Sequence, residues 1–393
     1  MKVVIVGGGI AGLASAVALD RAGHAVTVLE RAERYTEVGS GLSLWPNALR
    51  ALEAIGLGDH VRQRSRAARH PVIRTAMGRV LARTNVSELE RRFGPLLMIH
   101  RADLLDILRS ALPESVVRPR MEVHMVTPDG LVAHSGGVEH AHLIVGADGI
   151  RSTVRASICP ATPPPRFARY SAYRMLTDPV PLDAEGESWG RGERFGYAPL
   201  PDGRVYCFAV INTPPGAGRE SIEDLRRRFR DWHDPIPALL QATSADALLH
   251  RDIYDLAPLD SYVFDRVALV GDAAHAMTPN LGQGACQAIE DAVTLAVSID
   301  AHPTLPAALA CWDSQRRPRT QAVAARSRQV GSVAQWRFAP AVTLRNGLLR
   351  LLPQNAFLRS LTPVISWTPP PRADEPCGAA RAAKPFASSY PSD

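Results

Sequence analysis

The stretch that decides the fold is KVVIVGGGIAGLASAVALDRAGHAVTVLE, residues 2–30. Residues 3–6 form a β-branched run too short for a helix, and GGGIAG at residues 7–12 fits the spacing G-x-G-x-x-G. Apolar residues then recur at helical spacing over residues 13–19, and a second apolar run covers residues 26–29. The stretch therefore predicts a strand, a tight turn, a helix and a second strand.

Each special residue of this unit has a physical reason to bind a dinucleotide. Gly7 permits a sharp turn, Gly9 lets the backbone approach a pyrophosphate, and Gly12 lets the helix pack on the strand. Glu30 stands 18 residues after Gly12, where its carboxylate would accept ribose hydroxyls and repel a 2′-phosphate. The alternatives, an ordinary glycine-rich turn or a signal peptide, do not explain the strand, helix and acid together. We therefore predict a dinucleotide site that does not hold NADP.

Composition limits the classes of function. The 393 residues are 46% hydrophobic and 21% charged, as in a globular chain of about two domains. The net charge of +6 comes from scattered arginines, which disfavours a nucleic-acid surface, and no stretch reaches the roughly 18 apolar residues of a membrane span. The five cysteines form no CxxC pair, so we expect no metal site, reduced thiols and a cytoplasmic protein.

Two further stretches predict strands that end in polar loops. The apolar run 141–145 leads into GADGIRSTVR, which places Asp148 directly after a buried strand. The run 266–270 leads into GDAAHAMTPNLGQG and then a helix over about 285–299. Ligands of open α/β sheets bind at the carboxyl ends of the strands, so both loops are candidate binding corners. For GADG alone, a turn with capping residues is the alternative.

The residues between these stretches have a different sequence pattern, one typical of β-strands. Residues 166–254 contain long β-type segments, with a hairpin at Pro201-Asp202-Gly203, and residues 72–86 read as a hairpin turning at Met77-Gly78. A helix over 305–330 is expected to break at Pro318. We therefore predict an α/β protein: a Rossmann-like domain (1–71, 96–165 and 259–330), an inserted β-sheet substrate domain (72–95 and 166–258), C-terminal helices (331–367) and a flexible tail (368–393).

GGGIAG with Glu30, GADGIRSTVR and VGDAAHAMTPNLGQGACQAIEDA occur in an order and spacing that resemble the FAD-dependent single-component aromatic hydroxylases, the family of para-hydroxybenzoate and salicylate hydroxylases. The resemblance covers roughly residues 1–330 and includes GLSLWPNALRALEAIGL and HRADLLDIL. It implies an enzyme with bound FAD that uses NADPH or NADH and O2. O2 would form a flavin C4a-hydroperoxide, and this species would hydroxylate or epoxidise an aromatic or polycyclic small molecule. A monomer or a homodimer is expected.

The resemblance also implies roles for individual residues. Asp148 would lie by the pyrophosphate, in a stretch associated with FAD and reduced nicotinamide, and Asp272 on the ribityl or pyrophosphate side. The loop from Pro279 to Gly284 would lie against the isoalloxazine, and no single residue is assigned as the catalytic base. The implied cofactor-binding residues are Gly7, Gly9, Ala11, Gly12, Glu30, Arg31, Arg101, Asp148, Gly271, Asp272, Pro279, Gly282 and Gly284, with Pro279, Gly282, Gln283 and Gly284 forming the loop at the reacting flavin.

The inserted sheet would cover the substrate side of the flavin. Its candidate pocket residues, each with core packing as the alternative, are Tyr173, Arg174, Phe195, Tyr197 and Phe208. Arg174 would hold a substrate carboxylate or phenolate, or else form a surface ion pair. The sequence does not choose between NADH and NADPH.

The sequence bears on four other functions. A halogenase of this fold is disfavoured because W-x-W-x-I-P is absent and the only lysines are Lys2 and Lys384. A related FAD-dependent reductase of the disulfide type would need a cysteine pair after the first helix. A flavin protein that sequesters a reactive intermediate without turnover is the alternative from another class. An NAD-dependent dehydrogenase would leave the second and third stretches unexplained.

Overall fold

The computed structural model describes residues 1–33, 40–182, 184–214 and 216–371, and it confirms the predicted α/β class. A six-stranded sheet has the order β18-β19-β12-β1-β2-β8, and β1, β2, β8, β12 and β19 run parallel while β18 pairs antiparallel with β19. These strands are β1 (Lys2–Val6), β2 (Ala25–Leu29), β8 (Val117–Arg118), β12 (Leu143–Gly146), β18 (Val263–Phe264) and β19 (Val267–Leu269).

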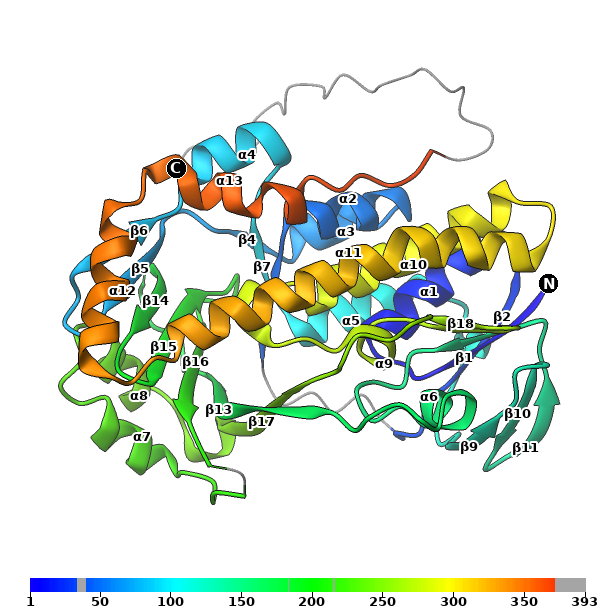
Figure 1. The fold of residues 1–393 in the computed structure, drawn as a ribbon, viewed down its shortest axis with the longest axis horizontal. Coiled ribbons are helices and arrows are strands. Elements are labelled where there is room, and N and C mark those ends of the chain that lie inside the picture. Colours follow the sequence, from blue (N-terminus) through cyan, green and yellow to red (C-terminus); the bar gives the residue numbers. More distant parts are fainter. Residues whose placement is uncertain (34–39, 183, 215, 372–393) are drawn as a thin grey trace.

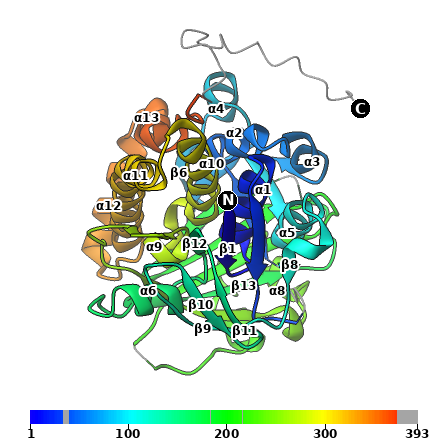
Figure 2. The same ribbon diagram turned by 90° about the vertical axis from the view of Figure 1, so that its right-hand side faces the viewer.

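Three helices cover one face of this sheet: α1 (Ile10–Arg21), α5 (Arg101–Ser110) and α10 (Gly284–Ala301). Figure 2 shows them above the sheet, with the antiparallel strands β9 (Val123–Val126), β10 (Leu131–His134) and β11 (Gly137–His140) below it. Strands β1, β12 and β19 are buried almost throughout, as expected of parallel strands covered on both faces.

The inserted sheet has seven strands in the order β17-β13-β16-β15-β14-β5-β6. The hairpins predicted at Met77-Gly78 and Pro201-Asp202-Gly203 are both confirmed, and each turn contains a glycine with positive φ. The β5–β6 hairpin joins the sheet by pairing parallel to β14. The strands are β5 (Pro71–Thr75), β6 (Val80–Arg83), β13 (Arg166–Leu176), β14 (Glu185–Trp189), β15 (Glu193–Pro199), β16 (Val205–Asn212) and β17 (Leu249–Asp255).

The expected break at Pro318 is wrong, because α11 (Leu305–Ala334) is one uninterrupted helix. Proline removes one backbone hydrogen bond, and buried contacts of this segment, including those of Arg316 with α10, stabilise the helix on either side of it. Figure 1 shows α11 running the length of the molecule, from the six-stranded sheet to the inserted one. It therefore crosses the boundary at residues 330–331 that the sequence suggests.

Two more helices, α12 (Ala339–Leu351) and α13 (Gln354–Ile365), end the described chain, and most of the predicted tail, residues 372–393, lies outside the described residues. No helix among the described residues is long and apolar enough to span a bilayer. The remaining elements are β3 (Gly41–Leu44), α2 (Pro46–Ala54), α3 (Gly58–Gln63), β4 (Arg66–Ala67), α4 (Val86–Phe93), β7 (Leu97–His100), η1 (Glu114–Val116), α6 (Thr153–Ile158), α7 (Ile222–Arg228), α8 (Ile236–Gln241), η2 (Ala245–Ala247), α9 (Asp272–His275) and η3 (Pro279–Leu281).

Candidate functional site

The three loops singled out in the sequence meet at one edge of the six-stranded sheet. They follow β1, β12 and β19, which are parallel neighbours, so their carboxyl ends lie side by side. Backbone hydrogen bonds tie the loops together: Ala147 donates to the Val6 carbonyl at 2.8 Å, and Val270 donates to the Gly146 carbonyl at 2.9 Å. This edge is where an open α/β sheet binds its ligand.

Of the three motif glycines Gly7, Gly9 and Gly12, only Gly9 has room for a side chain. Gly7 has φ +103°, and a Cβ there would lie 2.6 Å from the Ala147 carbonyl oxygen. A Cβ on Gly12 would lie 1.8 Å from the Gly7 carbonyl oxygen, so the first turn of α1 packs directly on the loop. A Cβ on Gly9 would meet nothing within 4 Å. The open space therefore lies at Gly9, beside the N-terminus of α1, where a pyrophosphate would be bound.

Glu30 lies against this loop. Its carboxylate accepts hydrogen bonds from the Gly8 N–H at 2.6 Å and from the Ala32 N–H at 2.7 Å. The two contacts place the carboxylate beside the glycine loop, and its contact with a ribose stays a prediction. Arg31 is exposed next to it, and Arg101 begins α5 and is half-buried.

The GADG loop contributes one polar atom that the protein does not satisfy. Asp148 accepts a hydrogen bond from the Val154 N–H at 3.0 Å through Oδ2, while its buried Oδ1 has no hydrogen-bond partner among the described residues. Buried acceptors are rarely left without a donor, so this atom marks a place for a ligand or a water.

Arg155 proves to be a structural residue of the same loop. Its guanidinium donates to the carbonyls of Ala273 at 2.7 Å and Ile150 at 2.6 Å, and burial lowers its pKa. It therefore fastens the GADG loop to α9, and Arg151 beside it is exposed.

The loop after β19 begins with Gly271, which has φ +56° and packs against α1, because a Cβ there would lie 2.7 Å from the Cβ of Ala11. Asp272 follows and is exposed, with no hydrogen bond to another described residue. His275 is buried, and its Nε2 lies 2.6 Å from Asp291 Oδ2. This histidine therefore fixes the loop.

The segment Pro279–Gly284 turns tightly in front of α10. Gly282 takes φ +61°, and a Cβ there would lie 2.6 Å from Ser43 Oγ, so the turn lies directly against β3. The buried Gln283 amide oxygen accepts hydrogen bonds from Asn47 Nδ2 and Gln287 Nε2, both at 3.0 Å. The loop is thus held from two sides, with the free N–H groups of the α10 N-terminus behind it.

A buried ion network below this loop was not predicted from the sequence. Arg316 donates to Glu290 Oε2 at 2.5 Å and to Asp291 Oδ1 at 2.8 Å, and all three side chains are buried. Glu290 also accepts from Asn47 at 2.6 Å, and Asp291 accepts from the Gly271 N–H at 3.0 Å. Two adjacent acids within an otherwise apolar helix were the available signal, since such acids need buried partners.

The charges in this network stabilise one another. Burial alone would raise the pKa of Asp291, but His275 and Arg316 hold it below its ordinary value. Burial alone would lower the pKa of Arg316, but Glu290 and Asp291 raise it. Asp291 therefore stays ionised and accepts hydrogen bonds from the loop that carries Asp272.

The inserted sheet corrects three of the pocket predictions. Tyr173, Phe195 and Tyr197 are almost fully buried in a core between this sheet and the helices α7 and α8. The Tyr173 hydroxyl accepts the Glu220 N–H there at 3.1 Å. Successive strand residues point to opposite faces. These three side chains therefore point away from the loops after β1, β12 and β19, which we call the flavin loops, and cannot line a pocket on that side.

The opposite face of the sheet looks toward the Pro279–Gly284 loop and carries the other two candidates, Arg174 and Phe208. Asn280 donates to the Tyr170 hydroxyl at 3.0 Å, and Arg194 donates to Asn280 Oδ1 at 2.7 Å. We call the side chains Tyr170, Arg174, Arg194, Tyr206 and Phe208 the inner face; the Tyr206 and Phe208 rings are 6.0 Å apart.

The inner face is polar at one end and aromatic at the other. Arg174 is half-buried and forms no hydrogen bond or ion pair with another described residue. Burial raises the pKa of Tyr206, and the neighbouring charge of Arg174 opposes that rise. Tyr206 packs over Gly41, since a Cβ on Gly41 would lie 2.7 Å from the tyrosine ring.

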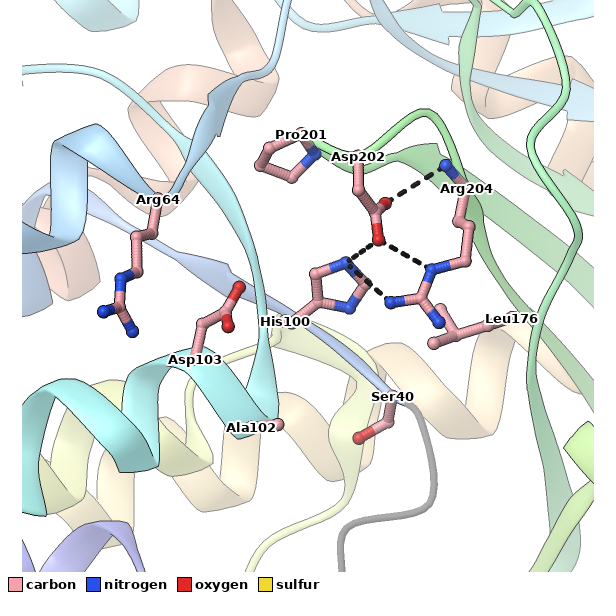
Figure 3. Close-up of a pocket in the computed structure, with 9 residues that line it drawn as sticks. All are labelled: Ser40, Arg64, His100, Ala102, Asp103, Leu176, Pro201, Asp202 and Arg204. Carbon is pink, nitrogen blue, oxygen red and sulfur yellow. Dashed lines mark hydrogen bonds and ion pairs between the residues drawn. The ribbon is translucent and has the colours of Figure 1, made fainter.

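A pocket of about 540 Å³ opens where α5 meets the β15–β16 hairpin (Figure 3). Figure 3 shows Asp202 between His100 and Arg204: its Oδ2 lies 2.9 Å from His100 Nε2 and 2.7 Å from Arg204 Nε. Asp103, in the first turn of α5, also lines the pocket. The lining is mostly polar and includes four charged side chains, so this pocket does not suit an apolar ring as the inner face does.

The residues present fit FAD. Gly9 opens onto free space at a helix N-terminus, Asp148 offers a buried acceptor without a donor, and the α10 N-terminus points donors at the Pro279–Gly284 loop. Such donors suit the edge of a flavin that carries negative charge when reduced.

Comparisons with known proteins agree with this geometry. The family model for a FAD binding domain matches residues 1–327. The aurachin C monooxygenase/isomerase of Stigmatella aurantiaca is 38% identical over 362 residues, which cover 90% of this chain and 94% of that protein. The 2-heptyl-3-hydroxy-4(1H)-quinolone synthase of Pseudomonas aeruginosa is 35% identical over 92% of this chain and 96% of that protein.

A solved structure with bound FAD has the same fold. The structure of Klebsiella pneumoniae HpxO complexed with FAD and uric acid superimposes with a TM-score of 0.86 at 27% identity, covering 93% of this chain and 97% of that one. The resemblance noted in the sequence is thereby confirmed. The chain belongs to the family defined by this FAD-binding domain, and it is a FAD-dependent monooxygenase of the aromatic hydroxylase type.

Proposed function

We propose that this monooxygenase hydroxylates a fused, nitrogen-containing aromatic compound of the quinolone class, with NADH or NADPH as the reductant. The observation that carries the proposal is the inner face, where two aromatic rings and a half-buried arginine stand opposite the loop assigned to the flavin. Two relatives support the choice of ring system, since one is named for a quinolone and one was solved with uric acid, both fused nitrogen heterocycles.

The bound FAD would supply the redox chemistry, accepting a hydride from the nicotinamide and activating O2 for transfer of one oxygen atom. The protein has three tasks. The loops that contain Gly9, Asp148 and Asp272 would bind the phosphates and ribityl chain. Tyr206 and Phe208 would hold the substrate ring and exclude water, which protects the activated oxygen from loss as hydrogen peroxide. Arg174 would orient an anionic or carbonyl oxygen of the substrate.

The test is stopped-flow absorbance of the purified protein with FAD. NADH or NADPH oxidation is followed with and without 4-quinolones, hydroxybenzoates and urate, and products are analysed by mass spectrometry for one added oxygen. We expect a 4-quinolone to accelerate nicotinamide oxidation and to gain one oxygen atom. Acceleration by hydroxybenzoates alone would contradict the substrate class.

Two other outcomes separate the rival functions. A bound flavin that no nicotinamide reduces would favour the sequestering protein, and oxidation without any oxygenated product would favour a reductase. The variant Phe208→Ala provides the internal check, because it removes a ring from the inner face. Met125→Ala, an exposed residue on β9, is its matched control. We expect Phe208→Ala to raise the substrate KM and the hydrogen peroxide yield, and Met125→Ala to leave both unchanged.

A further inference from the structure

Exposed apolar side chains gather in one short part of this molecule. Ten large apolar side chains are exposed in the described part of the chain, and seven of them lie between residues 333 and 352. Scattered exposed apolar residues are normal, whereas a contiguous group marks a surface that binds something. The seven are Val333 (36% exposed), Trp336 (36%), Phe338 (69%), Leu344 (60%), Leu348 (56%), Leu351 (81%) and Leu352 (53%).

Three of these leucines form one face of α12. Leu344, Leu348 and Leu351 have the spacing i, i+4, i+7, so they lie on the same side of the helix. We call these three the apolar face of α12. Figure 1 shows α12 at the left side of the molecule, beside the β5–β6 hairpin.

The other side of α12 is anchored firmly. Val342 and Arg345 are buried, and Arg345 donates to the carbonyls of Ala334 at 2.8 Å and Gly190 at 3.1 Å. The Arg345 guanidinium also lies over the Trp189 ring, 5.3 Å from its centroid. The helix therefore cannot turn to bury its leucines, and the apolar face is a fixed feature of the surface.

The chain around this face carries positive charge only. Residues 314–373 contain no Asp or Glu and ten arginines. Several of these arginines are used inside the protein, but Arg337, Arg350 and Arg359 are exposed and form no ion pair with another described residue. Arg337 and Arg350 flank the apolar face of α12, one before the helix and one in its last turn.

We propose that the apolar face of α12 docks on a phospholipid bilayer that contains anionic lipids. A helix that exposes leucines on one side, with arginines and no acids in the surrounding sequence, lies in the bilayer interface with its leucines at the acyl boundary. The arginines interact there with anionic headgroups. A second copy of the chain fits less well, because a two-fold contact brings the same patch against itself and would oppose arginine to arginine.

The experiment is flotation of the full-length, FAD-loaded protein with two kinds of vesicle, phosphatidylcholine alone and phosphatidylcholine with 30% phosphatidylglycerol. We expect binding to the anionic vesicles, and binding that weakens as salt is raised. The variant Leu344→Gln/Leu348→Gln/Leu351→Gln should abolish flotation. The variant Arg337→Gln/Arg350→Gln should lower the partition coefficient by roughly fivefold per arginine.

The matched control is Met125→Gln/Val138→Gln, two side chains that are 46% and 64% exposed and lie on the separate sheet of β9, β10 and β11. It should float like the unchanged protein. Flavin absorbance and thermal melts check that every variant is folded, which is expected because all the changed side chains are exposed.

Three results would overturn the proposal: no flotation of the unchanged protein with anionic vesicles, equal flotation with both vesicle types, or unchanged flotation of the triple leucine variant. If the protein does not float and the triple variant changes its mass in analytical ultracentrifugation, the face is a subunit contact instead. None of these measurements depends on the substrate, so failure here leaves the proposed reaction untouched.

Discussion

The edge of the six-stranded sheet and the inner face of the inserted sheet are built on different principles. At the sheet edge, backbone geometry makes the site: glycines at positions 7, 9 and 12, and hydrogen bonds between loops, leave one open space. On the inner face, side chains make the site, and a shift of one residue along a strand would replace Phe208 with a neighbour that faces the other way. The first kind of site tolerates little change, and the second can change its ligand by substitution alone.

The largest expected effect tests whether the sheet edge depends on its buried ions. In Arg316→Met, the carboxylates of Glu290 and Asp291 lose a buried cation, so we expect the free energy of unfolding to fall by about 3–5 kcal/mol. Arg317→Met on the same helix is the control, since the partly exposed Arg317–Asp313 pair should contribute about 1 kcal/mol or less. Urea denaturation gives both values, and equal losses would contradict the assignment.

The same network predicts a pH dependence with a definite sign. The pKa of Asp291 is held below its ordinary value in the folded protein, so the ionised group stabilises the fold above its unfolded pKa. That contribution is lost as the pH falls through the folded pKa. The difference in stability between the unchanged protein and Asp291→Asn should therefore shrink below about pH 4. A difference that stays constant from pH 7 to pH 3 would exclude this role.

A pair of phenylalanines separates the two faces of the inserted sheet. Phe195 is fully buried in the core with α7 and α8, so Phe195→Ala should cost about 3–5 kcal/mol of stability. Phe208 is half-buried on the inner face, so Phe208→Ala should cost clearly less. Thermal unfolding measures the loss of stability in each variant, and steady-state kinetics measures its KM. The comparison fails if Phe195→Ala changes KM and Phe208→Ala does not.

A single methyl group tests the open space at the glycine loop. In Gly9→Ala the new Cβ meets no protein atom within 4 Å, so the fold should be unaffected. If a pyrophosphate lies there, FAD should bind about tenfold more weakly, a loss of about 1.4 kcal/mol. Titration of the apoprotein followed by flavin fluorescence measures this. Gly218→Ala, also in open space, is the control. Unchanged affinity in Gly9→Ala would move the pyrophosphate elsewhere.

The smallest effect concerns Arg174. In Arg174→Gln we expect KM for an anionic substrate to rise about fivefold, a loss of about 1 kcal/mol, because the guanidinium is only half-buried. Arg251→Gln is the control, since Arg251 lies on the neighbouring strand β17 and is exposed. Steady-state kinetics with a neutral analogue provides the reference. An equal change for charged and neutral substrates would exclude a charge contact.

The sequence predicted the sheet edge well and the inner face poorly, for physical reasons. Glycine spacing reports backbone geometry directly, so the tight turn at residues 7–9 and the loop that leads into the helix at residue 284 could be assigned without knowing their neighbours. The face of Tyr173 could not be assigned, because strand alternation fixes relative but not absolute orientation. The pairing of Arg316 with two acids of α10 was also out of reach, because it joins residues 25 and 26 positions apart on different helices.

Because α11 continues through Pro318, one helix fixes the spacing between the flavin loops and the inserted sheet. The helix has 30 residues and is about 45 Å long. Arg316 donates hydrogen bonds to Glu290 and Asp291 below the flavin loops. Further along the helix, Arg328 donates to Asp255 of the inserted sheet at 2.6 Å. One residue inserted between them would turn the far end by about 100° and advance it by about 1.5 Å. Exposed side chains along this helix can therefore change, but an insertion or deletion between Arg316 and Arg328 would break the alignment of the flavin loops with the inserted sheet.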